Sequence, residues 1–234
     1  MPYYYWDPTY ILVLIGALLS VGASALVNRT FNHYSSVYAR SGLTGAQAAQ
    51  KLLHSQGIYD VQIQHISGSL TDHYDPRNKT LSLSDAVYNA TTVAAIGVAA
   101  HECGHAMQHA KGYVPLSIRS ALVPVVNFGS YLSWPLIVIG LFITVPQAVY
   151  FLNAGLLLFS LVVLFQLVTL PVEINASRRA VRLLDQEHIL IGDEVGQTAR
   201  VLKAAALTYV ASAAASILQL LRLLILTGGR RRDD

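Results

Sequence analysis

The sequence predicts a mainly α-helical integral membrane protein with three to four transmembrane helices and a small α+β domain outside the bilayer. Two observations carry this prediction. Hydrophobic residues make up 53% of the 234 residues, whereas Asp, Glu, Lys and Arg together make up only 12%, about half of the roughly 25% typical of soluble domains. The apolar content excludes a disordered chain, and the presence of a single cysteine, Cys103, excludes a disulfide scaffold.

Charged residues are missing from four segments. The longest of these covers residues 120–172, 53 consecutive positions without Asp, Glu, Lys or Arg. One helix needs about 20 residues to cross the hydrocarbon core, so this run has room for two helices and a turn. We predict these helices over 122–144 and 150–171, a first span over 10–27 and a last apolar run over 204–221.

The basic residues predict the orientation in the membrane. Seven of the sixteen Lys and Arg residues lie in 28–119 and five in 173–203, whereas the segment before the first span has none. The positive-inside rule therefore places both basic segments in the cytoplasm. A full crossing by the last run would leave the terminal arginines outside, so we expect this run to be re-entrant or interfacial; a broken rule is the alternative. The sequence has no basic face interleaved with aromatic residues, the pattern typical of nucleic-acid binding, so nucleic acid is not an expected partner.

The polar region after the first span has the composition of a small α+β domain. Thr44 is the predicted N-cap of a helix that ends before Gly57. Alternating residues predict strands over 61–66 and 79–84, which we expect to form a hairpin. A long helix is predicted over 89–110. The chain is predicted to divide into five parts. They are an N-terminal transmembrane helix (1–28), the α+β domain (29–117), a transmembrane hairpin (118–172), a polar helical region (173–203), and a C-terminal membrane or re-entrant helix with a basic tail (204–234).

The long helix contains an HExxH motif formed by His101, Glu102 and His105. Histidines at i and i+4 lie on one helix face, about 5–6 Å apart at Cβ, so both imidazoles can reach one zinc ion. Glu102 lies beside such a metal and is the candidate general base. The alternative is two histidines that make ordinary hydrogen bonds. The metzincin pattern is excluded because Gln108 and Lys111 occupy its glycine and histidine positions.

A catalytic zinc site needs a third protein ligand and keeps one position open. Of the four glutamates, Glu173 directly follows the long uncharged run, where a carboxylate without a partner is costly. The predicted hairpin would return Glu173 to the HExxH helix, so this residue is the candidate third ligand. The alternative is an interfacial carboxylate paired with Arg178 or another arginine.

These residues indicate metal-assisted amide hydrolysis, in which one further donor stabilises the oxyanion. His109, one turn beyond His105, is a candidate cleft residue, with a solvated or outer hydrogen-bonding role as the alternative. Cys103 points away from the ligand face and is predicted to pack in the interior. The candidates for the oxyanion donor are His73, Tyr74, Arg178 and Arg179. The alternative for each of them is a structural role only. The strand before the zinc helix is a candidate edge strand that would pair with an extended substrate; the alternative is that it only packs in the domain. Its residues are Lys79, Thr80, Leu81, Ser82, Leu83 and Ser84.

Several separated segments carry a resemblance to one family. They are the HExxH motif, Gly112-Tyr113, residues 118–124 and the stretch from Leu170 to Ala180, with further likeness over 70–77 and 204–210. Together they resemble the YugP-type neutral zinc metallopeptidases of bacterial membranes. The resemblance implies a gluzincin-like endopeptidase that holds one zinc ion through His101, His105 and Glu173 and uses Glu102 as its base. It also implies a multi-pass protein of a bacterial-type inner membrane, with a zincin-like domain and active site on the cytoplasmic side.

The chain is more distantly similar to the HtpX and CAAX prenyl proteases, which have an ExxxD pattern after the third ligand. Ser177 stands at the place of that aspartate and Asn175 is nearby, so both are candidates for orienting a zinc-bound histidine. The expected partners are a lipid bilayer and a peptide or membrane-protein substrate. Gly16 and Gly22 are not spaced as GxxxG, so the first span has no dimer motif.

Two other functions are weighed against the protease. A non-catalytic zinc-binding membrane adaptor would close its metal site with a fourth protein ligand. A metal transporter would need ionisable residues deep within its spans, and the 53-residue run has none.

Overall fold

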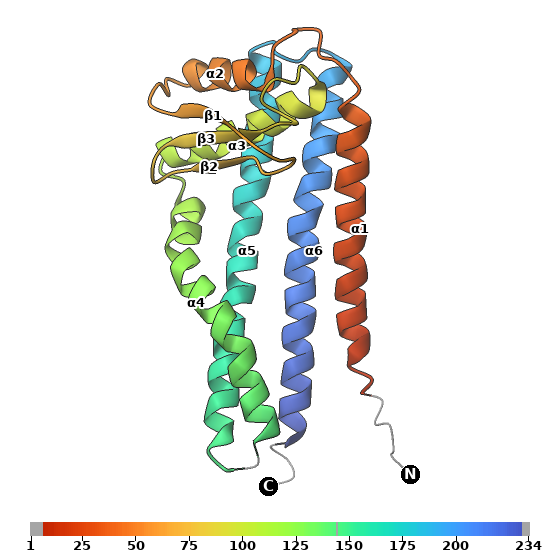
Figure 1. The fold of residues 1–234 in the computed structure, drawn as a ribbon, viewed down its shortest axis with the longest axis vertical. Helices are drawn as coiled ribbons and strands as arrows, with labels where there is room; N and C mark the ends of the chain where they lie inside the picture. The colour runs from red at the N-terminus through yellow and green to blue at the C-terminus, as the bar shows by residue number, and fades with distance from the viewer. Residues whose placement is uncertain (1–6, 144, 231–234) are drawn as a thin grey trace. The chain divides into compact units, whose positions relative to one another are not determined.

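The computed structural model of the protein describes residues 7–143 and 145–230, and Figure 1 labels its elements. The chain divides into two compact units. The helical unit comprises the residues up to Gly22, Ile118–Thr169 and the residues from Tyr209 on; the α+β unit comprises Ala23–Ser117 and Leu170–Thr208. The elements are α1 (Tyr10–Tyr34), α2 (Gly45–Ser55), β1 (Gln62–Ile66), β2 (His73–Asp75), β3 (Thr80–Ser84), α3 (Val93–Ala110), α4 (Val114–Phe142), α5 (Ala148–Gln186) and α6 (Asp193–Arg230).

The α+β unit contains a three-stranded sheet in the order β1-β3-β2. β1 runs parallel to β3, with Ile63 opposite Leu81, and β2 runs antiparallel to β3, with Tyr74 opposite Leu81. The predicted hairpin between 61–66 and 79–84 is therefore wrong. The turn over residues 76–79 instead joins β2 to β3, and β2 is only three residues long, too short for its alternation to be recognised in the sequence.

The position of β3 in the sheet also corrects the predicted substrate strand at Lys79–Ser84. β3 pairs with a strand on each side, and all five of its residues are buried. It therefore has no free backbone edge for a peptide. Lys79 lies outside the strand, in the turn, at a φ of +53°. The open edges of the sheet belong to β1 and β2.

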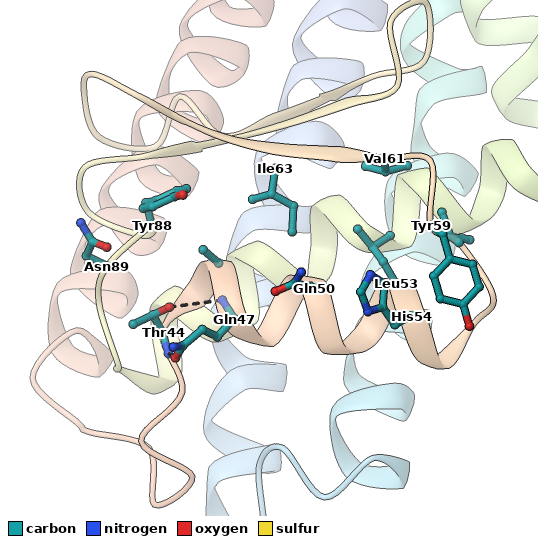
Figure 2. Close-up of a pocket in the computed structure, with 12 residues that line it drawn as sticks. Thr44, Gln47, Gln50, Leu53, His54, Tyr59, Val61, Ile63, Tyr88 and Asn89 are labelled. Atoms are coloured by element: carbon teal, nitrogen blue, oxygen red, sulfur yellow. Dashed lines mark hydrogen bonds between the residues drawn. The ribbon is translucent and has the colours of Figure 1, made fainter.

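Helix α2 begins where its capping residues predict. The Thr44 hydroxyl accepts from the Gln47 backbone N–H, and the Gln47 side chain accepts from the Thr44 N–H, a complete capping box; Figure 2 shows the first of these bonds. Gly57 follows the helix at a φ of +72°, which suits glycine. Leu52 and Leu53 of α2 are buried in the main core, so the helix is held against the interior of the unit.

Helix α3 begins at Val93, four residues later than predicted. Thr92 is extended and forms an isolated β-bridge with Tyr38, while its hydroxyl accepts from the Ala95 N–H as an N-cap. The first turns of α3 are fully buried. This apolar stretch therefore forms the core of the α+β unit, which explains a hydrophobic run too short to cross a bilayer.

Four helices are long and apolar enough to cross a membrane: α1, α4, α5 and α6. Within the helical unit, α4 and α5 form the predicted hairpin. A Cβ on Gly155 would lie 2.9 Å from the Ile137 backbone nitrogen, so a glycine is required for the two helices to approach this closely. α5 then continues as one helix past residue 172, so Glu173 lies inside a helix instead of opening a new segment.

The last apolar run is part of one continuous helix, α6. In the helical unit, the Arg222 guanidinium lies 3.1 Å from the Asp7 carboxylate and 4.2 Å from the centre of the Tyr10 ring. The C-terminal part of α6 therefore lies beside the start of α1. Arg231 and Arg232 of the predicted basic tail lie outside the described residues.

We predict that Leu81→Ala, at the fully buried centre of β3, lowers the free energy of unfolding by about 2–5 kcal/mol, because it leaves a cavity that the sheet cannot fill. The measurement is denaturant unfolding of the detergent-solubilised protein. Leu70→Ala is the control, since this side chain is 44% exposed and its loss is expected to change stability by no more than about 0.5 kcal/mol. Equal effects of the two substitutions would contradict the assigned core.

Candidate metal centre

Three side chains of the α+β unit bring one metal-ligating atom each to a common point. Glu173 Oε2 lies 3.2 Å from His101 Nε2 and 3.5 Å from His105 Nε2. The ligating atoms of the three residues all lie within 4.8 Å of one another. Ligands at about 2.0–2.1 Å around a tetrahedral zinc ion are separated by about 3.3 Å. Two imidazole nitrogens and one carboxylate oxygen are also a donor set that zinc prefers, so the residues present fit a zinc ion.

The cluster forms because α3 and α5 approach each other closely. His101 and His105 occupy successive turns of α3, and Glu173 lies on α5. A Cβ on Gly104 would lie 2.6 Å from the Ala176 carbonyl oxygen, a distance that no ordinary side chain allows. Gly104, inside the HExxH motif, therefore lets α5 approach close enough for Glu173 to reach both histidines.

The ligand atoms lie in a protected environment. The Glu173 side chain is 2% exposed, and those of His101 and His105 are 13% and 10% exposed. Burial alone would lower the pKa of His105, but its hydrogen bond with Glu173 and the negative charges of Glu102 and Glu173 outweigh burial and raise the pKa. The site thus stabilises positive charge at the point where a metal cation would bind.

Both histidines are also held by their other ring nitrogen. His101 Nδ1 lies 3.0 Å from the Ser177 hydroxyl, and His105 Nδ1 lies 3.0 Å from Gln108 Oε1. The Nε2 atoms are therefore the ones that face Glu173. The predicted role of Ser177 agrees with this contact. Sequence reasoning used Gln108 only to exclude the metzincins, although its position three residues after His105, on the same helix face, was a usable signal.

Asn175 contacts the histidines only indirectly. Its Oδ1 accepts hydrogen bonds from Gln108 Nε2 at 3.0 Å and from Arg179 Nε at 2.7 Å. The Arg179 guanidinium also lies 5.9 Å from the centre of the Tyr113 ring. Arg179, a predicted oxyanion candidate, is thus engaged with Asn175.

Glu102 has the environment expected of a general base. The residue is only 8% exposed, and its negative charge contributes to the raised pKa of His105. Its carboxylate makes no hydrogen bond or ion pair within the described part of the chain. Its oxygens are not among the fully buried side-chain atoms that lack a partner, so they keep some accessible surface and are available to a water molecule or a substrate.

The remaining sequence candidates bond to residues other than the ligands or are exposed. Tyr74 on β2 bonds to His109 Nδ1 through its hydroxyl at 2.8 Å. Burial and the charges of Asp60 and Asp75 raise the pKa of Tyr74 to about 12, so the phenol keeps its proton. His73 Nδ1 donates to the Thr71 carbonyl at 2.9 Å. No hydrogen bond joins any of these side chains to His101 or His105 within the described chain. Arg178 is exposed.

Cys103 packs in the interior, as predicted. It is fully buried, and its Sγ donates to the Ala49 carbonyl at 3.6 Å. Burial raises the pKa of the thiol, so the residue stays protonated and is a poor metal ligand.

A cavity of about 530 Å³ lies between α2 and β1 in the α+β unit. Figure 2 shows Ile63 of β1, and Val61 just before this strand, above Gln50 and Leu53 of α2. The lining includes none of the candidate ligands or bases, so the cavity is separate from the metal cluster.

Comparison with known proteins agrees with this geometry. A family model described as "Putative neutral zinc metallopeptidase" matches residues 9–228. The chain belongs to this family. A curated relative, the "Putative membrane protease YugP" of Bacillus subtilis (strain 168), is 44% identical over 223 residues, covering 94% of this chain and 98% of the relative. No solved structure matches the chain. The resemblance to this metallopeptidase family found in the sequence is thus confirmed.

We predict that Gly104→Ala weakens zinc binding about tenfold or more, because the added methyl group must displace Ala176 and with it Glu173. Zinc affinity is measured by competition with a chelator, using full-length protein in detergent. Gly196→Ala in α6 is the matched control, since a Cβ there meets nothing within 4 Å and alanine favours a helix. Unchanged zinc affinity in Gly104→Ala would refute the close approach.

Proposed function

We propose that the protein is a zinc-dependent membrane endopeptidase that hydrolyses peptide bonds with Glu102 as general base. The observation that carries this proposal is Glu102, a residue only 8% exposed whose carboxylate has no partner among the described residues and which directly follows His101 of the three-ligand cluster. Membership of the metallopeptidase family supports the same class of reaction.

In this proposal His101, His105 and Glu173 hold one zinc ion per chain. Three protein ligands leave a fourth position open, as in catalytic zinc sites. Bound zinc would lower the pKa of a water ligand toward 7 and polarise the scissile carbonyl. The ligand side chains are held by Gln108 and Ser177, which limits their movement during turnover.

Glu102 moves the proton. Its carboxylate accepts a proton from the attacking water as the new C–O bond forms at the carbonyl carbon. It then gives that proton to the amide nitrogen as the C–N bond breaks, so that a carboxylic acid and an amine leave.

Tyr74 is the proposed donor to the oxyanion. It lies on β2, which has an open edge, and its hydroxyl reaches α3 one turn beyond His105. With a pKa of about 12, it keeps the proton that it would donate. The free edge of β2, and not β3, would pair with an extended substrate.

The alternative function is a non-catalytic zinc-binding membrane adaptor. Such a site is usually closed by four protein ligands. Three residues of the described chain form the cluster, and the nearby Glu102 carboxylate has no partner. These two features support catalysis over a structural site.

We predict that Glu102→Gln lowers the rate of peptide cleavage by about 10²–10⁴-fold, because glutamine cannot accept the proton, while zinc content stays at one per chain. Activity is measured on a fluorogenic peptide library with the zinc-loaded, detergent-solubilised protein. Glu187→Gln is the control, a substitution away from the cluster. Wild-type cleavage by Glu102→Gln would exclude Glu102 as the base, whereas no cleavage by the zinc-loaded wild-type chain would favour the adaptor.

The charge distribution and the helix lengths support a specific topology. The two segments with twelve of the sixteen basic residues contain the three residues of the metal cluster, so the α+β unit would face the cytoplasm of a bacterial-type cell. The Asp7–Arg222 ion pair brings the end of α6 to the start of α1. The start of α1 and the end of α6 would then lie on the outer side, with α6 crossing fully, in contrast to the re-entrant or interfacial run expected from the positive-inside rule.

We predict that Pro8→Cys and Gly228→Cys react with a membrane-impermeant maleimide in intact cells, whereas Ser55→Cys reacts only after permeabilisation. All three positions are exposed, and the native Cys103 is fully buried. Labelling is detected by a mass shift of the purified chain. If Gly228→Cys resists labelling in intact cells while Pro8→Cys reacts, α6 does not cross the membrane.

A further inference from the structure

We propose that Gln108 is a positioning residue that selects the ring tautomer of His105 and so presents Nε2 to the metal. The inference rests on the proposed zinc site and deepens it. Gln108 is fully buried, and both ends of its carboxamide are engaged. Its Oε1 lies 3.0 Å from His105 Nδ1, and its Nε2 lies 2.8 Å from the Val172 carbonyl oxygen and 3.0 Å from Asn175 Oδ1.

The chemistry of its partners determines the orientation of the Gln108 amide. The Val172 carbonyl can only accept a hydrogen bond, and the Arg179 guanidinium can only donate one. Because Arg179 Nε donates to Asn175 at 2.7 Å, the Asn175 atom between them must be the oxygen. Gln108 therefore faces two acceptors on one side, and only its NH₂ group can satisfy them.

This orientation leaves one choice for His105. With the NH₂ group directed to Val172 and Asn175, the Gln108 oxygen faces His105 Nδ1. An oxygen acceptor requires Nδ1 to carry a proton, so the lone pair of the neutral imidazole lies on Nε2. Nε2 is the atom 3.5 Å from Glu173 Oε2. The chain of contacts from Arg179 to His105 thus prepares the nitrogen that would bind zinc.

The same contacts join the two helices that supply ligands. Gln108 lies on α3, three residues after His105, and Val172 directly precedes Glu173 on α5. A single side chain therefore orients one ligand and contacts the backbone next to another. The reversed amide would place its single oxygen against two acceptors, the Val172 carbonyl oxygen and Asn175 Oδ1, which is strongly disfavoured in a buried site.

The other histidine lacks this restriction. The Nδ1 of His101 faces the Ser177 hydroxyl at 3.0 Å, and a hydroxyl can either donate or accept. Ser177 holds the ring but does not select its tautomer. Of the two contacts, only the one between Gln108 and His105 selects a ring tautomer.

The test compares zinc affinity in two variants of Gln108, using full-length protein in detergent and a competing chelator. Gln108→Met has a similar volume and no hydrogen bonds, and it is expected to bind zinc about 10–100-fold more weakly than wild type. Gln108→Glu keeps an oxygen acceptor for Nδ1–H, and its other oxygen, when protonated, can donate to the Val172 carbonyl or to Asn175 Oδ1. This variant is expected to recover about tenfold or more of that loss. Gln50→Met, at an exposed position on α2, is the matched control with unchanged affinity.

The order of the two variants separates positioning from packing. If Gln108 only fills space, methionine is tolerated better than a buried carboxylate, and Gln108→Met binds zinc more tightly than Gln108→Glu. That order, or wild-type affinity in Gln108→Met, overturns the proposal. A wild-type chain that binds zinc but cleaves no peptide contradicts the proposed function alone. A wild-type chain that binds no zinc overturns both.

A second measurement needs no metal. Nitrogen NMR of metal-free protein labelled with ¹⁵N-histidine reports which ring nitrogen carries the proton, at a pH where His105 is neutral. The His105 signals are identified by their loss in His105→Asn. We expect the Nδ1–H form in wild type and Gln108→Glu, and loss of this preference in Gln108→Met. The same tautomer in all three proteins contradicts the inference.

Discussion

The close approach of α3 and α5 is the constraint on which the metal cluster depends. The Ala176 carbonyl oxygen lies where a Cβ on Gly104 would be, so only glycine permits this distance between the helices. The approach brings Glu173 within 3.5 Å of both histidines. Because the added bulk of one methyl group would disturb this arrangement, a residue that touches no metal is as important to the site as the ligands themselves.

Burial of so many polar groups is tolerated because their hydrogen bonds form a connected network. Gln108 has partners at both ends of its amide, and Asn175 joins it to Arg179. A network of this kind is rigid, since each group loses a partner if its neighbour turns. Glu102 is the exception, with a buried carboxylate that has no partner within the described chain. The contrast distinguishes the groups that hold the site from the group available for chemistry.

The order of the strands in the small sheet determines which strand packs in the core and which strands have open edges. With β3 in the centre, its leucines complete the core of the α+β unit while its backbone is fully paired. The strand that contacts α3 near the cluster is β2, through the bond between Tyr74 and His109. Under the proposed function, an extended peptide would pair with the open edge of β2, beside a tyrosine whose phenol stays protonated.

The sequence by itself determined the helical membrane character, and it predicted His101, His105 and Glu173 as candidate ligands and Glu102 as candidate base. It could do so because composition and i, i+4 spacing act locally along the chain. Only the tertiary structure decided the strand order and the role of Gln108. Strand order depends on which backbones meet in space, and β2 is too short to have a readable pattern. The role of Gln108 depends on Val172 and Asn175, which are more than sixty residues away in the chain and become its neighbours only when the helices pack.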